Sequence, residues 1–158
     1  MKKIKYPLVG YPFTESDMSS GRKILTTKNI VTMSKVTRKF EKKFAKYLGV
    51  KYALMVNSGS SANLLAFFAL INPKSKNRLK PKSECIIPAI CWSTSLWPIV
   101  QAGLKPVFVD VNLQTFNIDI DDLKKKITKK TKAILAVHVL GNSTNMDELK
   151  KIIKKRKL

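Results

Sequence analysis

The chain has 158 residues, of which 31 are lysine or arginine and 10 are aspartate or glutamate, so its formal net charge is +21. Its 44% hydrophobic content excludes disorder along the whole length. No apolar run approaches the ~18 residues of a membrane-spanning helix, and the start of the chain lacks the apolar stretch of a signal peptide. The only cysteines, Cys85 and Cys91, are too few for a disulfide framework. The composition therefore predicts a globular, cytoplasmic protein.

The positive charge comes almost entirely from lysine, because four of the basic residues are arginine and 27 are lysine. Proteins that read nucleic acids use arginine for bidentate contacts to guanine and phosphate. The lysine excess is more typical of solvated faces, so we expect no specific nucleic-acid partner and no membrane partner. A weak, salt-sensitive affinity for polyanions follows from charge alone.

The N-terminal part predicts an extended arm over residues 1–13, a short helix over 14–25 and a loop over 26–31. Thr14 has the position of an N-cap for the short helix. Residues 32–48 give the strongest helix prediction, because their apolar residues share one face. These residues are Met33, Val36, Phe40, Phe44 and Leu48. Gly49 then ends the helix.

From residue 52 onward the pattern alternates between short apolar strands and helices. The strands are expected over 52–56, 84–87, 106–110 and 132–139, and the helices over 61–71, 93–103, 118–127 and 144–155. The helix over 61–71 is apolar nearly all round, so we expect it to be buried. Pro98 favours a helix that begins nearer Trp97 than Ser93. The alternation predicts an α/β fold with a largely parallel sheet covered on both sides.

The way in which the sequence ends bears on how much of a domain it contains. The sequence stops after a helix that is basic from Lys150 to Lys157. A sheet of this type normally continues with another strand at that point. The pattern therefore predicts a chain that is cut rather than finished.

The strongest local signal for a binding site is the strand–turn–helix around Asn57–Asn63. A helix N-terminus offers unpaired N–H groups and partial positive charge, which favour anions. Gly59 lets the backbone approach an anion closely, and Ser58, Ser60 and Ser61 add hydroxyl groups. The segment therefore predicts a phosphate site, and the alternative is an ordinary serine-capped helix start. Neither a Walker A loop nor a GxGxxG motif is present.

Two further segments follow expected strands, where ligands of α/β sheets bind. Trp92 could stack on a planar ring and Thr94 could hydrogen-bond nearby, whereas the alternative places Trp92 and Trp97 in the core. His138, the only histidine, could touch a ligand at the same edge of the sheet or be an ordinary core residue. A single histidine and two cysteines without CxxC spacing predict no metal site.

Several ordered segments together resemble the DegT/DnrJ/EryC1/StrS family of pyridoxal-phosphate (PLP)-dependent sugar-nucleotide enzymes. The segments are Phe40–Ala53, Val56–Asn63, Pro88–Ala89, Gly103–Val111, Thr115–Asp119, Thr131–Ile134 and His138–Asn142. The form of Asn57–Ala66, with the long insert that follows, is most similar to the branch of the CDP-4-keto-6-deoxyglucose 3-dehydrases. The resemblance implies the α/β/α sandwich of fold-type-I aminotransferases, with an arm and short helix over 1–31 and a partial PLP-binding large domain over 32–158.

The resemblance also implies roles for individual residues. Gly59 and Ser60 would hold the phosphate of PLP or pyridoxamine phosphate through backbone amides, with Ser58 and Ser61 nearby. Trp92 would stack on the pyridine ring, with Thr94 beside it, and His138 would lie next to the cofactor. The aspartate that pairs with the ring nitrogen and the catalytic lysine or histidine of the family lie beyond the matching region. The chain is therefore expected to contain no catalytic residue and to be inactive alone.

Three functions remain open at this point. The first is a fragment of a PLP-dependent aminotransferase or C3-dehydrase that acts on a nucleotide-linked 4-keto-6-deoxy sugar in O-antigen or surface polysaccharide synthesis, homodimeric in its full-length form. The second is a non-catalytic module that pairs with a full-length relative. The third is a polyanion binder that uses the basic segments Lys124–Lys132 and Lys150–Lys157.

Overall fold

The computed structural model describes residues 10, 12–26, 28, 30–32 and 34–156. The chain divides into two compact units, one ending at Met55 and the other beginning at Val56. The expected arm over 1–13 falls largely outside the described residues, and the expected domain boundary after residue 31 stays a prediction. Within the described ranges, no helix is long and apolar enough to cross a membrane.

Among its described residues, the first unit contains two helices, α1 (Glu15–Ile24) and α2 (Lys35–Leu48). The expected cap of α1 is confirmed: Thr14 and Asp17 form a capping box, and the hydrogen bonds from Thr14 lower the pKa of Asp17. The expected start of α2 at residue 32 is wrong, because the Ser34 hydroxyl accepts the Val36 N–H and so fixes the cap there. The predicted C-terminal stop is confirmed, since Gly49 has a left-handed backbone with φ of 69°.

The expected strand over 52–56 is absent from the structure. The Met55 N–H donates instead to the Glu41 carboxylate on α2, at 2.8 Å. A strand exists only where a neighbour supplies paired backbone groups. An apolar sequence was therefore not sufficient to make this segment part of the sheet.

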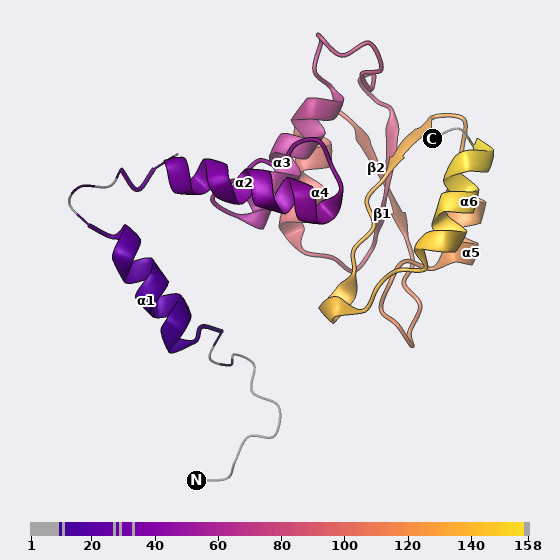
Figure 1. Ribbon diagram of the computed structural model, residues 1–158. Helices are drawn as coiled ribbons and strands as arrows, with labels where there is room; N and C mark the ends of the chain where they lie inside the picture. Colours follow the sequence, from indigo (N-terminus) through magenta and orange to yellow (C-terminus); the bar gives the residue numbers. More distant parts are fainter. Residues whose placement is uncertain (1–9, 11, 27, 29, 33, 157–158) are drawn as a thin grey trace. The chain divides into compact units, whose positions relative to one another are not determined.

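The second unit alternates helices with strands around a three-stranded sheet (Figure 1). In chain order its elements are α3 (Gly59–Leu70), β1 (Glu84–Pro88), α4 (Ser93–Gln101), β2 (Lys105–Val109), α5 (Ile120–Lys126), β3 (Thr131–Ile134), the 3₁₀ turn η1 (Val139–Gly141) and α6 (Met146–Arg156). The strand order is β2-β1-β3, and both pairs are parallel. The predicted parallel sheet is confirmed, with three strands instead of four.

Strand β1 is buried along its whole length and divides the core into two layers. Cys85 and Ile87 pack with residues of α3 and α4, whereas Ile86 packs with residues of α5 and α6. This follows from the two-residue period of a strand. Helices therefore lie on both faces of the sheet, as Figure 1 shows, and the predicted α/β/α layering is confirmed.

Two expectations about helices α3 and α4 need correction. Only Phe67 of α3 is buried, so the helix expected to be buried exposes much of its apolar surface in this chain. Helix α4 begins at Ser93 and includes Pro98, so a start near Trp97 is wrong. Pro98 is itself buried, and an amide from α3 satisfies the carbonyl that proline leaves without its helical donor.

Strand β3 is shorter than the expected strand over 132–139. The Leu135 N–H still donates to the Ile86 carbonyl of β1 at 2.8 Å. After Leu135 side chains become the partners: the Thr144 hydroxyl donates to the Val137 carbonyl, and the Val139 N–H donates to the Asn117 amide oxygen. Such local side-chain bonds compete with the strand ladder. The chain therefore leaves the sheet after Leu135, before it reaches His138.

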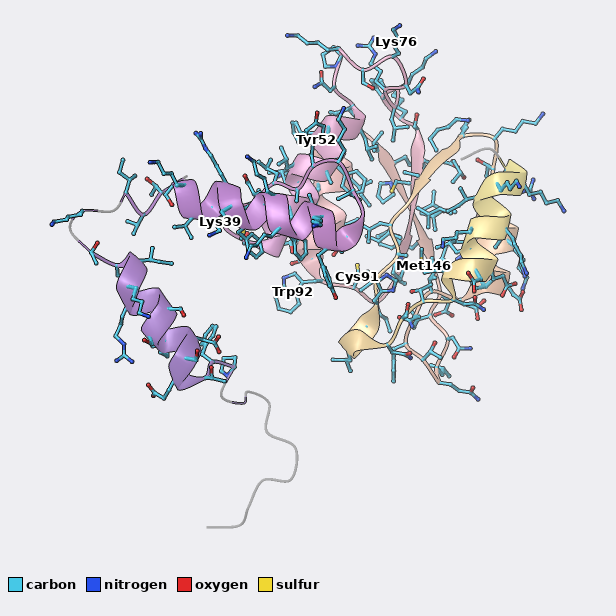
Figure 2. The ribbon with its side chains drawn as sticks, in the orientation of Figure 1. Lys39, Tyr52, Lys76, Cys91, Trp92 and Met146 are labelled. Atoms are coloured by element: carbon cyan, nitrogen blue, oxygen red, sulfur yellow. The ribbon has the colours of Figure 1, made fainter. Side chains whose placement is uncertain are left out.

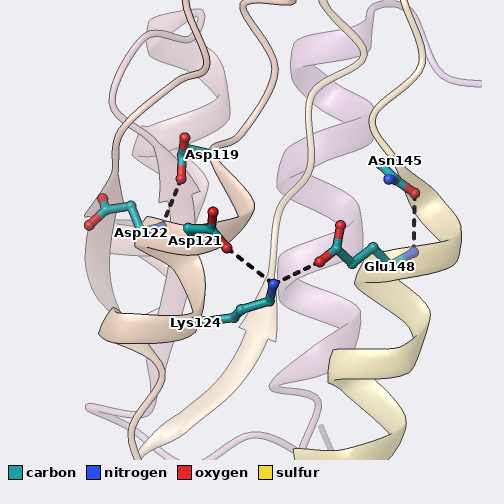
Figure 3. Close-up of polar contacts among 6 residues, drawn as sticks. All are labelled: Asp119, Asp121, Asp122, Lys124, Asn145 and Glu148. Carbon is teal, nitrogen blue, oxygen red and sulfur yellow. Dashed lines mark hydrogen bonds and ion pairs between the residues drawn. The ribbon is translucent and has the colours of Figure 1, made fainter.

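Polar contacts join α5 and α6, the two helices that pack with Ile86 of β1 (Figure 3). The Lys124 ammonium lies 2.7 Å from a Glu148 oxygen and 3.2 Å from an Asp121 oxygen. The hydrogen bonds to these carboxylates raise the pKa of Lys124. Asp119 caps α5 through the Asp122 N–H, and the Asn145 side chain accepts the Glu148 N–H in the first turn of α6.

We expect the stabilising effect of Asp122 to depend on pH. Its carboxylate accepts the Asp110 N–H at 2.9 Å and pairs with Lys126 at 2.9 Å, and these contacts lower its pKa. A carboxyl whose pKa is lowered by folding stabilises the protein above its unfolded pKa of about 3.9 and loses that effect as the pH falls through the folded value. Urea unfolding should therefore show wild type exceeding Asp122→Asn in stability near neutral pH, with the difference shrinking below pH ~4. A difference that stays constant on acidification contradicts this assignment.

Candidate functional site

The serine-rich turn before α3 has the geometry of a capped helix start with free space beside it. Ser58 is the N-cap: its hydroxyl oxygen accepts the Ser61 N–H at 3.1 Å and lies 3.2 Å from the Ser61 hydroxyl. Helix geometry leaves the N–H groups of Gly59 and Ser60 without intrahelical acceptors. A Cβ added at Gly59 would meet no atom within 4 Å, so the backbone there is open to approach. The turn can therefore offer amides and the Ser60 and Ser61 hydroxyls to an anion, while the Ser58 hydroxyl is engaged in the cap.

Trp92 lies at the start of α4, as Ser58 lies at the start of α3. It is the N-cap residue, it makes no side-chain cap bond, and it is 75% exposed. Its side chain and that of Cys91 lie beyond the end of β1 (Figure 2). Trp97 is 55% exposed, so the alternative that both tryptophans fill the core is not what the structure has. An indole face at this position is open to a planar ligand.

One hydrogen bond ties the two helix starts together. The Asn63 side-chain amide, one turn into α3, donates to the Thr94 carbonyl in the first turn of α4 at 3.4 Å. Both residues are half-buried. The serine turn and Trp92, which are separated by 30 residues of sequence or more, are therefore held on neighbouring helix ends.

His138 is exposed and held by its backbone surroundings. Its Nδ1 atom accepts the Thr144 N–H at 3.0 Å, so the geometry assigns the proton of the neutral ring to Nε2. Asn117, which is only 4% exposed, accepts the Val139 N–H at 3.0 Å and donates to the Asn142 carbonyl at 3.1 Å. The histidine is thus a fixed, accessible donor and not a core residue.

The topology places these groups at one edge of the sheet. Strands β1 and β3 are parallel neighbours. Trp92 follows the carboxyl end of β1, and His138 follows that of β3. Ligands of open α/β sheets bind at this edge.

The two cysteines differ in their surroundings. Cys85 lies in β1 with no exposed surface, and desolvation raises its pKa to about 12. Partial burial also raises the pKa of Cys91, next to Trp92. Because the thiolate is the nucleophilic form, both residues are protonated and poor nucleophiles at neutral pH.

Sequence reasoning missed three residues that support this edge: Asn63, Asn117 and Thr144. Pro98 was an indirect signal for Asn63. A proline inside a helix leaves the backbone carbonyl four residues earlier without its N–H donor, so another group has to donate to that carbonyl. The partners of Asn117 and Thr144 depend on the fold of the loops and had no local signal.

Comparison with known proteins identifies the class to which this chain belongs. Residues 13–158 match the DegT/DnrJ/EryC1/StrS aminotransferase family. The chain therefore belongs to this family, as its sequence motifs predicted. It is 46% identical over 150 residues to the GDP-4-keto-6-deoxy-D-mannose 3-dehydratase of Escherichia coli O55:H7, a match that covers 95% of this chain and 38% of that protein.

A second relative and a solved structure support the same assignment. The lipopolysaccharide biosynthesis protein RfbH of Salmonella typhimurium is 44% identical over 129 residues, covering 81% of this chain and 30% of the relative. The structure of E. coli GDP-4-keto-6-deoxy-D-mannose-3-dehydratase with bound hydrated PLP superimposes with a TM-score of 0.89 at 45% identity, covering 98% of this chain and 39% of the other. The chain thus has part of the α/β fold of fold-type-I PLP-dependent aminotransferases and spans about two fifths of the length of its dehydratase relatives.

Proposed function

We propose that this chain is part of a PLP-dependent enzyme that dehydrates at C3, or transaminates, a nucleotide-linked 4-keto-6-deoxy sugar for O-antigen or another surface polysaccharide. Its similarity to a sugar-nucleotide dehydratase and to a lipopolysaccharide biosynthesis protein supports this function. The observation that carries the proposal is the pairing of an amide-rich helix start with an exposed tryptophan, joined by the Asn63–Thr94 hydrogen bond.

The residues present fit the phosphate and ring of the cofactor. The amides of Gly59 and Ser60 and the hydroxyls of Ser60 and Ser61 would bind the phosphate, since they are donors at the positive end of a helix. Trp92 would lie against the pyridine ring, with Thr94 beside it. His138 would direct its Nε2–H toward the same edge. When bound, PLP supplies an electron sink for carbanion chemistry.

These roles are binding and orientation, not proton transfer to substrate. We assign no general base or Schiff-base lysine to the 158 residues and expect no turnover from them alone, because such chemistry needs a positioned base. The complete enzyme is proposed to be a cytoplasmic homodimer with a nucleotide-sugar substrate and without a specific nucleic-acid or membrane partner.

The proposal predicts phosphate-dependent binding of a cofactor to this chain. Pyridoxamine phosphate is the suitable probe, because the aldehyde of PLP would react with many of the 27 lysines. In a Trp97→Phe background Trp92 is the only tryptophan, so its fluorescence quenching reports the site. We expect saturable quenching, with pyridoxamine, which lacks the phosphate, binding at least tenfold more weakly, an effect of ~1.4 kcal/mol.

Equilibrium dialysis then tests the role of the ring. Trp92→Ala should weaken pyridoxamine phosphate binding about tenfold, since stacking contributes on the order of 1 kcal/mol. Trp97→Phe, on the same helix and also exposed, is the matched control and should bind like wild type. Equal affinity for pyridoxamine and its phosphate, or equal loss in both variants, would overturn the proposal.

A further inference from the structure

We propose that Asn63 is a positioning residue: its amide supplies the hydrogen bond that Pro98 removes from α4 and thereby fixes Trp92 relative to the phosphate-binding turn. The cofactor-binding consequence rests on the function proposed above. The structural part concerns only the contact between α3 and α4 and is testable without ligand.

Pro98 creates the need for this contact. In an α-helix the N–H of residue 98 would donate to the carbonyl of Thr94, four residues earlier. Proline has no N–H, and its ring crowds the carbonyl at that position, so the Thr94 carbonyl is left without this helical donor. Thr94 is half-buried, where a carbonyl without a donor is costly.

Asn63 meets this need from the neighbouring helix. Its Nδ2 atom donates to the Thr94 carbonyl at 3.4 Å. Further along both helices, Phe67 of α3 belongs to the same apolar cluster as Ile99 of α4 and Ala102, which follows α4. Asn63 is therefore the polar connection at the end of the helices that carries the serine turn and Trp92.

The connection matters because it is a side-chain hydrogen bond to the backbone of the first turn of α4, in addition to the burial of Ser95 and the packing of Cys91 and Leu96 against the core. Trp92 makes no side-chain cap bond, and its carbonyl accepts the Ser95 N–H at 2.8 Å in a tight first turn. Without Asn63 the Thr94 carbonyl must turn toward water, which reorients this turn and the indole that precedes it. The apolar packing of Phe67 would remain, so the unit should stay folded.

Four variants in the Trp97→Phe background test the idea: Asn63→Ala, Asn63→Asp, Pro98→Ala and the double variant Asn63→Ala/Pro98→Ala. Asn63→Asp keeps the size of the side chain and removes the donor. Pro98→Ala restores the backbone N–H that should satisfy Thr94 from within the helix. Gln101→Ala, an exposed amide at the far end of α4, is the matched control.

The ligand-free readouts are amide hydrogen exchange in the first turn of α4 and the fluorescence anisotropy of Trp92. We expect both Asn63 single variants to speed exchange of the Ser95 amide and to increase indole mobility, with Gln101→Ala unchanged. The double variant should resemble Pro98→Ala. Failure of Pro98→Ala to suppress the effect of Asn63→Ala would overturn the inference, because a general packing defect would not be repaired by a backbone N–H.

Pyridoxamine phosphate affinity provides the second readout. Loss of one hydrogen bond of this kind is expected to weaken binding about three- to tenfold in the Asn63 variants, with recovery to within about twofold of Pro98→Ala in the double variant. If wild type does not bind the probe but the exchange pattern holds, the proposed function fails and the positioning role stands. If wild type binds and the Asn63 variants bind equally well, the positioning role fails and the function stands.

Discussion

Ile86→Ala is expected to lower the free energy of unfolding by about 2–5 kcal/mol, the range for removing a buried aliphatic side chain. Ile86 lies at the centre of β1, the middle strand, and has no exposed surface. It pairs with Val107 and Ile134 and packs into the layer formed with α5 and α6. The cavity left by alanine should remain largely open, because paired strands on both sides of β1 hold the backbone in place.

Urea denaturation followed by circular dichroism measures this effect. Ile86→Val is the graded control and should cost only about 0.5–1.5 kcal/mol. Val100→Ala, on the exposed side of α4, is the positional control and should change stability by less than about 0.5 kcal/mol. Comparable losses in Ile86→Ala and Val100→Ala would show that β1 is not the centre of the core.

Asn117→Ala is expected to destabilise the second unit by about 1–3 kcal/mol and to release the loop after His138. Its amide oxygen accepts the Val139 N–H and its amide nitrogen donates to the Asn142 carbonyl, contacts across more than 20 residues of sequence. The side chain is almost fully buried, so alanine leaves two backbone groups without these partners. Hydrogen exchange at Val139 should therefore accelerate together with the loss of stability.

The histidine ring provides a more specific test of this prediction. In wild type, ¹⁵N shifts of His138 should show the proton on Nε2, because Nδ1 accepts the Thr144 N–H. Asn117→Ala should produce a mixture of tautomers as the loop loosens, whereas Asn142→Ala, whose side-chain bond is 3.5 Å long and exposed, should leave the ring unchanged. An unaltered His138 in Asn117→Ala would mean that Thr144 alone positions the ring.

Local signals in the sequence predicted where the helices lie and several of their ends, although the expected starts of α2 and α4 were wrong. The Thr14 capping box and the left-handed Gly49 act within a few residues, so the sequence pattern contains the whole interaction. The parallel sheet also followed from the alternation of apolar strands with helices. The serine turn at residues 58–61 was placed on a helix start for the same local reason.

Apart from the start of α2, where the local cap at Ser34 was missed, the errors depend on partners distant in the sequence. Residues 52–56 have strand-like composition, but the Met55 N–H pairs with Glu41 and no strand is formed. The strand expected to reach 139 ends at Ile134, and beyond Leu135 Thr144 and Asn117 bind the backbone of Val137 and Val139. The start of α4 was misplaced because the cost of Pro98 is offset by Asn63, on another helix. Secondary-structure propensities describe a residue and its neighbours in sequence, so they carry no information on these contacts.

The strand order β2-β1-β3 has a consequence for how this unit assembles. Glu84 pairs with Lys105 across the short α4 crossover, whereas its other neighbour, Thr131, is 47 residues away. Because closing a longer loop costs more entropy and non-local pairing is slow, β1, α4 and β2 should associate first and provide the edge on which β3 adds. During synthesis this early βαβ unit is complete before the loop that carries His138 has been made, so the histidine reaches the proposed ligand-binding edge last.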